Sequence, residues 1–269
     1  TVSIDTILPG AMTVQTWLTD NLINAAEYAN TLPDITGLGA EANTTFTAKI
    51  YYKKNGNTLS SPAFTVTVGA NGAWSISGNA IKTFLDSAVD YGPFELQVYQ
   101  TDVHGNDSPL TTQIYFLDKD VPNPPLSVDM PSANDGWLNA VEASRVEMRI
   151  YFDSNHAPKA NDKLSVQFWK YAYKQAQRPA NVAPDFSLPD DLVITDADIL
   201  AGYKLVTLTT SVLQQDSTQT QVQEIDFEFK ITDQGNNVST VFRKTAHLDT
   251  QINTLVINPD PTTVVGGVT

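Results

Sequence analysis

Leu22-Ile23-Asn24-Ala25-Ala26-Glu27 and Trp137-Leu138-Asn139-Ala140-Val141-Glu142 are two versions of one phrase. A second phrase follows each of them: Thr101-Asp102-Val103-His104-Gly105-Asn106 after the first, and Thr232-Asp233-Gln234-Gly235-Asn236 after the second. Two markers in the same order, twice, indicate a tandem repeat of domain size. Repeats of this length fit one β-sandwich each, so the chain is predicted to be all-β.

The composition excludes several classes of partner. The chain has 269 residues, with 30 acidic residues against 16 basic ones, which gives a formal charge of −14. Such a charge repels phosphate backbones and anionic lipids, so we expect no nucleic-acid binding, and it attracts cations. The simpler interpretation is that the charge serves solubility alone. No apolar run approaches the ~20 residues of a membrane span, so we expect no membrane insertion.

The chain contains no cysteine, which excludes disulfides, thiolate metal sites and cysteine nucleophiles together. Both a reducing compartment and export of an unfolded bacterial surface protein would account for this. The cysteine count therefore leaves the compartment open.

Alternating apolar residues place the strands of the first repeat. Period-two patterns predict half-buried strands. The inward-facing residues expected from these patterns are Phe46, Ala48, Ile50 and Tyr52; Phe64, Val66 and Val68; Phe94, Leu96 and Val98; and Ile114 with Phe116. Trp74 lies between a turn and a strand and is expected to be buried. Only Asn79 to Leu85 reads as a helix.

A proline-rich stretch separates the two repeats. Asp120-Val121-Pro122-Asn123-Pro124-Pro125 blocks helices and central strands and favours a stiff spacer. We therefore predict domain 1 over residues 1–120, a linker over 121–125 and domain 2 over 126–253, with an insertion around 169–191. Residues 254–269 would be a linker or the start of a next repeat. Leu126 to Asp129 matches Val2 to Asp5 as an opening strand, and Thr195 to Ile199 aligns with the helix of the first repeat.

These motifs resemble the bacterial Ig-like repeats of giant Gram-negative surface adhesins of the RTX type, which are secreted by type I systems. The resemblance rests on the two repeated phrases, on the opening Val2-Ser3-Ile4-Asp5 and on Asn71-Gly72-Ala73-Trp74-Ser75. It covers domain 1 almost throughout and domain 2 only at its ends. It implies two tandem Ig-like β-sandwich domains arranged end to end in a calcium-rigidified stalk on the outer surface of a bacterial cell. Neighbouring repeats of the same chain would be its partners.

The carboxylates suggest where calcium could bind. In a sandwich of alternating strands, the first turn and the end of the last strand lie at one pole, and the loop before the last strand lies at the other. Domain 1 would then present Asp20, Glu27, Asp118 and Asp120 to Asp233 and Asn236 of domain 2. Calcium takes six to eight oxygen ligands, so this junction is a candidate site. Alternatively, Glu27 caps a helical turn, Asp233 shapes its own turn, and Asp118 and Asp120 are solvated charges.

A second acidic cluster is expected to be structural, with calcium binding as the alternative. Asp196 and Asp198 fit the first turn of a helix that begins after Thr195, where carboxylates suit the helix dipole. The remaining members are Asp185, Asp190 and Asp191.

The insertion in domain 2 concentrates aromatic and basic residues. Trp169, Tyr171, Tyr173 and Arg178 are of the types that anchor interfaces, and aromatic rings also stack on sugars. They form the candidate ligand-binding surface, with a host-surface or biofilm glycan or protein as the partner. The alternative is a strand that continues from Leu164 and packs these rings on its own domain.

No catalytic motif occurs in the sequence. Nucleophile elbows, zinc-protease helices and phosphate-binding loops are all missing, and the three histidines are far apart. We therefore expect a non-catalytic segment of a large surface adhesin, serving as a stalk or extender. Two alternatives stay open: a ligand- or carbohydrate-binding module at an adhesin tip, and an accessory sandwich of a secreted hydrolase.

Overall fold

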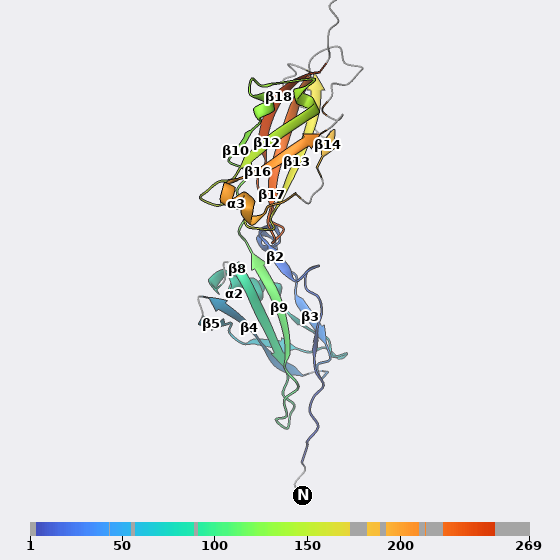
Figure 1. Cartoon of the computed structure of the whole chain (residues 1–269). Helices are drawn as coiled ribbons and strands as arrows, with labels where there is room; N and C mark the ends of the chain where they lie inside the picture. The colour runs from blue at the N-terminus through green and yellow to red at the C-terminus, as the bar shows by residue number, and fades with distance from the viewer. Residues whose placement is uncertain are drawn as a thin grey trace, which may run out of the picture.

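The protein consists of two β-sandwiches stacked end to end (Figure 1). The computed structural model describes residues 4–42, 44–54, 57–88, 91–172, 182–188, 192–209, 213 and 223–250. One hydrophobic core runs from Met12 to Leu117 and a separate one from Val128 to Leu248. We refer to the two sandwiches as domain 1 and domain 2. The predicted all-β fold with two tandem Ig-like sandwiches is thus confirmed.

Domain 1 packs a small sheet, in the order β1-β3-β7, against a larger sheet in the order β2-β9-β8-β4-β5, where β6 also pairs with β4. Two helices complete it. Its elements are β1 (Thr13–Val14), β2 (Leu22–Asn24), α1 (Ala25–Ala29), β3 (Ile35–Leu38), β4 (Thr45–Lys54), β5 (Asn57–Ser60), β6 (Phe64–Thr67), β7 (Trp74–Ile76), α2 (Gly78–Ala88), β8 (Tyr91–Tyr99) and β9 (Thr111–Asp118).

Domain 2 repeats this plan with sheets β10-β12-β16 and β11-β18-β17-β13-β14, where β15 also pairs with β13. Its elements are β10 (Ser127–Asp129), the 3-10 helix η1 (Pro131–Ala133), β11 (Trp137–Asn139), the 3-10 helix η2 (Glu142–Ser144), β12 (Arg145–Tyr151), β13 (Lys163–Ala172), β14 (Phe186–Ser187), β15 (Leu192–Val193), α3 (Asp196–Ala201), β16 (Tyr203–Thr209), β17 (Gln223–Thr232) and β18 (Phe242–Asp249).

The first repeated phrase is a short strand followed by a tight turn. In domain 1, β2 runs parallel to the last strand β9, with Asn24 opposite Asp118. In domain 2, β11 runs parallel to the last strand β18, with Asn139 opposite Asp249. The same phrase therefore delivers the same turn to the same pole of each sandwich.

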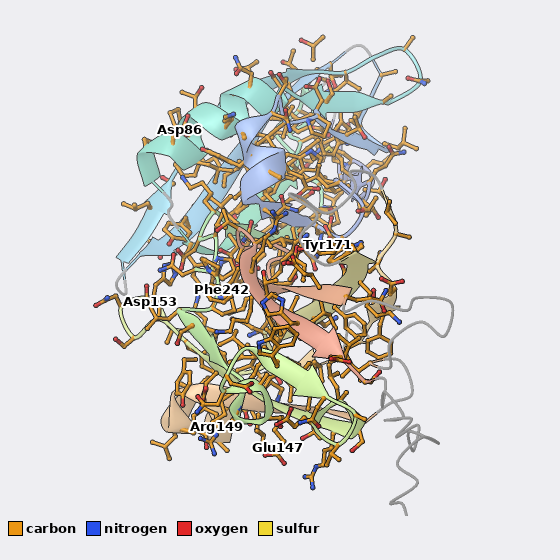
Figure 2. All side chains as sticks on the ribbon, turned by 90° about the horizontal axis from the view of Figure 1, so that it is seen from above. Asp86, Glu147, Arg149, Asp153, Tyr171 and Phe242 are labelled. Carbon is orange, nitrogen blue, oxygen red and sulfur yellow. The ribbon has the colours of Figure 1, made fainter. Side chains whose placement is uncertain are left out.

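The core of domain 1 follows the predicted alternation on β4 and β8. Phe46, Ala48, Ile50 and Tyr52 are buried, as are Phe94, Leu96 and Val98. Trp74 is 3% exposed and packs edge-on against Phe46, as expected for a core residue. Figure 2 shows the side chains of both domains on the ribbon.

The inward face predicted for β9 is wrong by one residue. Ile114 is 60% exposed, whereas Tyr115 and Leu117 are fully buried. Because side chains alternate between the faces of a strand, a shift of one residue exchanges the two faces. Ile114, Phe116 and Tyr91 instead cover the outer side of the sheet, where the rings of Phe116 and Tyr91 meet edge-on at 5.3 Å.

The helix of domain 2 is not the counterpart of the helix in domain 1. α2 connects β7 to β8, whereas α3 precedes β16, the strand that corresponds to β7. The predicted alignment of Thr195 to Ile199 with Asn79 to Leu85 is therefore wrong. The local prediction for α3 is confirmed, because the Thr195 side chain accepts a hydrogen bond from the Asp198 N–H and caps the helix.

The opening strands also correspond differently from the prediction. β10 pairs with β12, and the strand that pairs with β3 in the same way is β1, not the segment near Asp5. Asp5 therefore lies well before the first strand of its sandwich. Its carbonyl accepts from Asn106 as the carbonyl of Asp120, just before the linker, accepts from Asn237.

Candidate functional site: the junction between the two domains

A tight loop between β17 and β18 forms the end of domain 2 that faces domain 1. Asp233 organises this loop: its Oδ1 accepts a hydrogen bond from the Asn237 N–H at 2.8 Å, and its Oδ2 accepts one from Asn237 Nδ2 at 3.1 Å. Asn236 adopts a positive φ of 60°, a conformation that asparagine tolerates better than most residues. The Asp–Asn pair therefore fixes the loop and places the Asn237 side chain at the domain boundary.

Asn237 joins the two domains through a single buried amide. Its Nδ2 donates to the carbonyl oxygens of Asp118 at 3.1 Å and Asp120 at 3.3 Å, in addition to Asp233. Its Oδ1 accepts the backbone N–H of Ala25 at 2.7 Å. The residue is only 3% exposed. An amide that is buried and used at both ends fixes the register between two surfaces, since any shift leaves polar groups unpaired.

The N–H of Ala25 is available because of how α1 begins. Asn24 is the N-cap, and its side chain accepts the N–H of Glu27, while the Glu27 carboxylate accepts the N–H of Asn24. This capping box leaves the first N–H groups of the helix without partners inside it. Asn237 supplies one of those partners from the other domain.

Four aspartates surround this contact. Asp118 and Asp162 are buried at 4% and 2% exposure, and Asp120 and Asp233 lie beside them. Burial raises the pKa of the Asp118 carboxyl, and the negative charges of Asp233 and Asp120 add to the rise. Burial likewise raises the pKa of Asp162, whose Oδ1 has no hydrogen-bond partner among the described residues.

Two nitrogen-bearing side chains of domain 2, His156 and Lys159, lie beside this cluster of carboxylates. His156 Nε2 lies 3.2 Å from Asp120 Oδ1, and Lys159 Nζ lies 3.9 Å from Asp120 Oδ2. The Lys159 ammonium also sits 4.6 Å from the ring centroid of Tyr91, at the end of domain 1. Lys159 therefore contacts both the linker and the neighbouring sandwich.

Gly235 allows the two domains to approach closely. A Cβ at this position would lie 2.5 Å from Asp118 Oδ2 and 2.8 Å from Asp118 Cβ, which is closer than real side chains come. Any residue other than glycine would have to push the end of β9 away. The loop thus combines a small residue for close approach with an amide for hydrogen bonding.

The residues predicted for a junction calcium site separate into two groups. Asp118, Asp120 and Asp233 do meet at the junction. Asp20 and Glu27 accept hydrogen bonds from Leu22 and Asn24 inside their own turns. Asn236 supplies the left-handed backbone position, and it is the next residue, Asn237, that reaches across.

Four contributors at the junction were missed from the sequence: Asn237, His156, Lys159 and Asp162. Of these, only Asn237 could have been identified from a repeated pattern, the spacing of four residues between aspartate and asparagine. In the first loop, Asp102 bonds to the asparagine four positions later, Asn106, and the fourth position after Asp233 is Asn237, not Asn236.

The chemistry of these donors suits calcium, but their spacing does not yet form a site. Two ligands on one calcium ion, each at 2.3–2.6 Å, can be no more than about 5 Å apart. Within the described ranges, the one group of three or more ligands that lie within 4.8 Å of one another is Asp5, Asp102 and His104. The hollow between Asp120, Asp162 and Asp233 measures only about 10 Å³. Calcium binding at the junction therefore stays a prediction and would require these carboxylates to move together.

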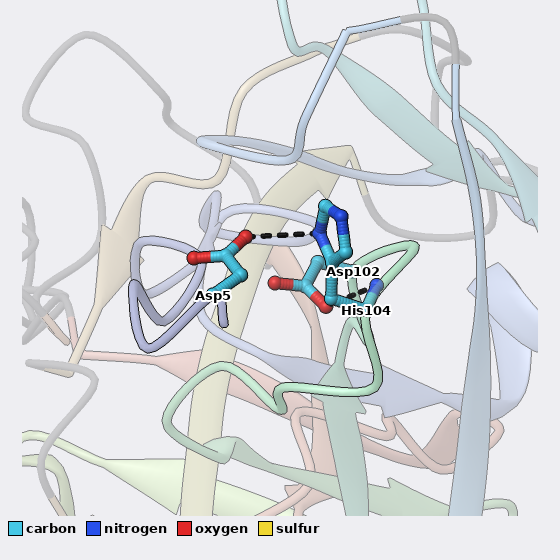
Figure 3. A group of neighbouring side chains, drawn as sticks. All are labelled: Asp5, Asp102 and His104. Atoms are coloured by element: carbon cyan, nitrogen blue, oxygen red, sulfur yellow. Dashed lines mark hydrogen bonds and ion pairs between the residues drawn. The ribbon is translucent and has the colours of Figure 1, made fainter. Parts of the chain in front are cut away.

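The same loop occurs at the opposite end of domain 1, beside the segment that contains Asp5 (Figure 3). Asp102 Oδ2 accepts a hydrogen bond from Asn106 Nδ2 at 2.8 Å, and this bond lowers the pKa of Asp102. Asn106 also donates to the Asp5 carbonyl, as Asn237 does to the Asp120 carbonyl. His104 Nδ1 lies 2.9 Å from Asp5 Oδ2. His104 stands at the position of Gly235.

Comparisons with known proteins leave the family unassigned. No protein-family model matches the chain, and no curated sequence matches it. A 1.5-MDa bacterial ice-binding adhesin shares 19% identity over 89% of this chain and 64% of its own, with a TM-score of 0.39. Fibronectin(III)-like modules of Clostridium thermocellum CbhA share 12% identity over 90% and 94%, with a TM-score of 0.36. The FN1–FN3 domains of chicken CNTN1 share 11% identity over 91% and 68%, with a TM-score of 0.37.

The structure places the predicted ligand-binding residues in packing positions where it describes them. Trp169 is 6% exposed, and its Nε1 donates to the Val182 carbonyl at 2.9 Å. Tyr171 is half-buried on the same face of β13 and is labelled in Figure 2. Tyr173 and Arg178 lie outside the described residues. The strand interpretation of this segment is therefore the better one for Trp169.

The corresponding face of domain 1 is open. A hollow of about 390 Å³ lies on the outer side of its larger sheet and is lined by Tyr51, Thr58, Pro93, Phe94, Glu95, Gln97 and Ile114. In domain 2, the segment around Val182 and Asp185 covers this side, and Asp185 accepts the Lys170 N–H. Over the part of the chain that is described, no helix has the length and apolar character needed to cross a bilayer.

Proposed function

We propose that this chain is a non-catalytic extender segment of a bacterial cell-surface adhesin, in which two sandwiches are held in one fixed orientation. The observation that carries the proposal is the buried Asn237 side chain, which hydrogen-bonds to Ala25, Asp118 and Asp120 of domain 1 and its linker. A spacer must transmit position from one end to the other. A junction that cannot slide without breaking buried hydrogen bonds meets that requirement.

The linker supports the same role. Pro122, Pro124 and Pro125 restrict the backbone, and Asn123 Nδ2 donates to Asp153 Oδ2 of domain 2 at 2.9 Å. Domains joined by flexible linkers normally move relative to each other unless specific contacts prevent it. Here the chain between the sandwiches is short, stiff and anchored at both ends.

The adhesin context comes from the motif resemblance. The repeated Asn-Ala-x-Glu and Thr-Asp phrases suggest a stalk of many repeats, with neighbouring repeats of the same chain as the partners and the bacterial surface as the location. A host-surface or biofilm glycan or protein would then bind elsewhere on the adhesin or on the open face of domain 1.

Calcium at the junction is a further part of the proposal. Asp118, Asp120 and Asp233, with the buried and unpaired Asp162 oxygen, offer hard oxygen ligands. If calcium binds there, the melting temperature should rise with calcium and fall with chelator. A stabilisation of about 2.7 kcal/mol is expected at a hundredfold excess over the dissociation constant. Equal melting temperatures in both conditions would leave Asn237, Lys159 and His156 as the junction's own fastening.

The extender proposal is tested by measuring the freedom between the domains. Because the chain has no cysteine, single cysteines can be introduced at exposed Thr36 in domain 1 and Thr207 in domain 2 and spin-labelled. A narrow distance distribution is expected for the parent and a broad one for Asn237→Ala. Asn106→Ala removes the same side chain at the opposite pole and should leave the distribution narrow. A broad distribution in the parent would contradict a fixed spacer.

A further inference from the structure

The far end of domain 2 repeats the surface that domain 1 presents to the junction. Asn139 lies opposite Asp249 in a parallel pair, as Asn24 lies opposite Asp118. The Asn139 side chain accepts the N–H of Glu142, and the Glu142 carboxylate accepts the N–H of Asn139, which reproduces the Asn24–Glu27 exchange. We call this surface, formed by Asn139, Ala140 and Asp249, the distal plug.

The distal plug is exposed where its counterpart is covered. Ala25 is half-buried under Asn237, and Asp118 is 4% exposed. Ala140, at the position of Ala25, is exposed, and Asp249 is half-buried. The same backbone pattern therefore exists twice in the chain, once inside an interface and once on the surface.

The two loops of the chain differ in their ability to accept such a plug. In the Asp233–Asn237 loop, a Cβ at Gly235 would lie 2.5 Å from Oδ2 of Asp118, the last residue of β9. The Asp102–Asn106 loop has His104 at that position, with its Nδ1 2.9 Å from Asp5 Oδ2. An imidazole there would overlap the end of the last strand of any sandwich that docked in the geometry of the junction. The glycine loop admits a plug, and the histidine loop rejects it.

We propose that the distal plug is a docking surface for a further β-sandwich that carries an Asp-x-Gly-x-Asn loop, as a second domain 2 does. The Asn237 of that sandwich would accept the Ala140 N–H and donate to the Asp249 carbonyl. Its His156 and Lys159 would face the connecting segment, as they face Asp120 here. This inference rests on the proposed extender function, and it adds the polarity of assembly and the residue that selects the partner.

The test uses two fusions that differ in the loop offered to the plug. The first joins residues 1–250 to residues 120–250, so that Asp249-Thr250-Asp120 reproduces the spacing of Asp118-Lys119-Asp120 and a second domain 2 follows the first. The second joins residues 1–250 to residues 5–269, so that domain 1, with His104, follows domain 2. In the first fusion, spin labels at Thr207 of each copy of domain 2 report the distance across the new junction. In the second fusion, the labels are at Thr207 of the first copy and Thr36 of the second copy.

A narrow distribution is expected in the first fusion, and one at least about twofold broader in the second, since unrestrained domains move freely. Asn237→Ala in the second copy alone should broaden the distance distribution of the first fusion. His104→Gly should narrow the distance distribution of the second fusion, which consists of two complete domain pairs. Thermal unfolding confirms that each added copy is folded. A broad first fusion, or equal widths in both fusions, would overturn the proposal.

These outcomes are distinguishable from a failure of the extender function itself. The parent junction is measured separately between Thr36 and Thr207 within one copy. A narrow parent with a broad first fusion defeats only the docking inference. A broad parent defeats the proposed function as well.

Discussion

The Asp102–Asn106 loop and the Asp233–Asn237 loop share the hydrogen bonds between their aspartate and asparagine and have different surroundings. In both, an aspartate accepts from the asparagine four residues later, and the residue before that asparagine has a positive φ. Asn237 is buried in an interface, whereas Asn106 is half-exposed beside the N-terminal segment. The loop itself is therefore a structural repeat, and its neighbours decide whether it becomes a joint.

The two loops also differ at the residue two positions after the aspartate. Gly235 lets Asp118 lie against the loop, whereas His104, at the equivalent position of the other loop, has its Nδ1 2.9 Å from Asp5 Oδ2. The comparison can therefore be tested by changing one residue at a time in each loop.

The largest difference is expected from removing the two asparagines. Asn237→Ala leaves the Ala25 N–H and two carbonyls without their buried partner, at a cost of about 2–3 kcal/mol in the free energy of unfolding. Asn106→Ala loses only half-exposed hydrogen bonds and should cost about 1 kcal/mol or less. Urea unfolding of both variants measures the difference. Equal losses would mean that the junction adds nothing to the loop.

The next prediction compares the third position of each loop. Gly235→Ala forces Asp118 to move, and overpacking of this kind typically costs about 1–3 kcal/mol. His104→Ala removes an exposed side chain and should stay within about 0.5 kcal/mol of the parent. Thermal unfolding and the interdomain distance distribution provide the readouts. A Gly235→Ala protein with an unchanged distribution would show that the domains are not in close contact there.

Acidification should increase the stability contributed by Asp118 and Asp162 at the junction and decrease the stability contributed by Asp102 at the opposite end of domain 1. The pKa values of Asp118 and Asp162 are raised by burial, so the folded state holds their protons more tightly than the unfolded state. Their contribution to stability is present below the ordinary value of 3.8 and is lost as the pH rises through the raised pKa. The pKa of Asp102 is lowered, so its contribution is present above 3.8 and is lost as the pH falls through the lowered pKa.

Unfolding at a series of pH values measures this difference in Asp118→Asn and Asp102→Asn variants. Asp118→Asn should flatten the gain in stability on acidification between neutral pH and 3.8. Asp102→Asn should leave that gain in place. If Asp102→Asn flattened the gain and Asp118→Asn did not, the gain on acidification would not come from the junction.

The smallest effect is expected at Lys159. Its ammonium is 54% exposed and lies 3.9 Å from the Asp120 carboxylate, a pair worth about 0.2–1 kcal/mol at most in solvent. Lys159→Met keeps the aliphatic stem near Tyr91 and removes the charge, so its effect should shrink further in high salt. A loss as large as that of Asn237→Ala would mean that the ion pair, and not the amide, fastens the junction.

The sequence was sufficient where a pattern was strong and local. The alternation on β4 and β8 identified the buried faces, and Trp74 was recognised as core. On β9, both faces carry apolar residues, because Ile114 and Phe116 cover the outside of the sheet while Tyr115 and Leu117 fill the inside. Periodicity cannot choose between two apolar faces, so the register was assigned wrongly.

The candidate site depended on information that a motif alone does not contain. Sandwich topology correctly brought Asp118 and Asp120 to the pole that faces Asp233. The choice between Asn236 and Asn237 required the hydrogen-bond pattern of the loop, in which the asparagine four residues after the aspartate is the partner. Lys159 and Asp162 come from a connection between β12 and β13 that has no repeated phrase to mark it.

The parallel pairing of β2 with β9 has a mechanical consequence. If tension is applied along the axis of the chain, it pulls β2 toward the N-terminal end and the end of β9 toward domain 2. Because these strands are parallel and joined at Leu22–Phe116, Ile23–Leu117 and Asn24–Asp118, the pull slides one along the other and strains all of their hydrogen bonds at once. β11 and β18 have the same arrangement in domain 2. Each sandwich is therefore clamped in shear at the point where force enters and leaves it, and neither can be opened one bond at a time.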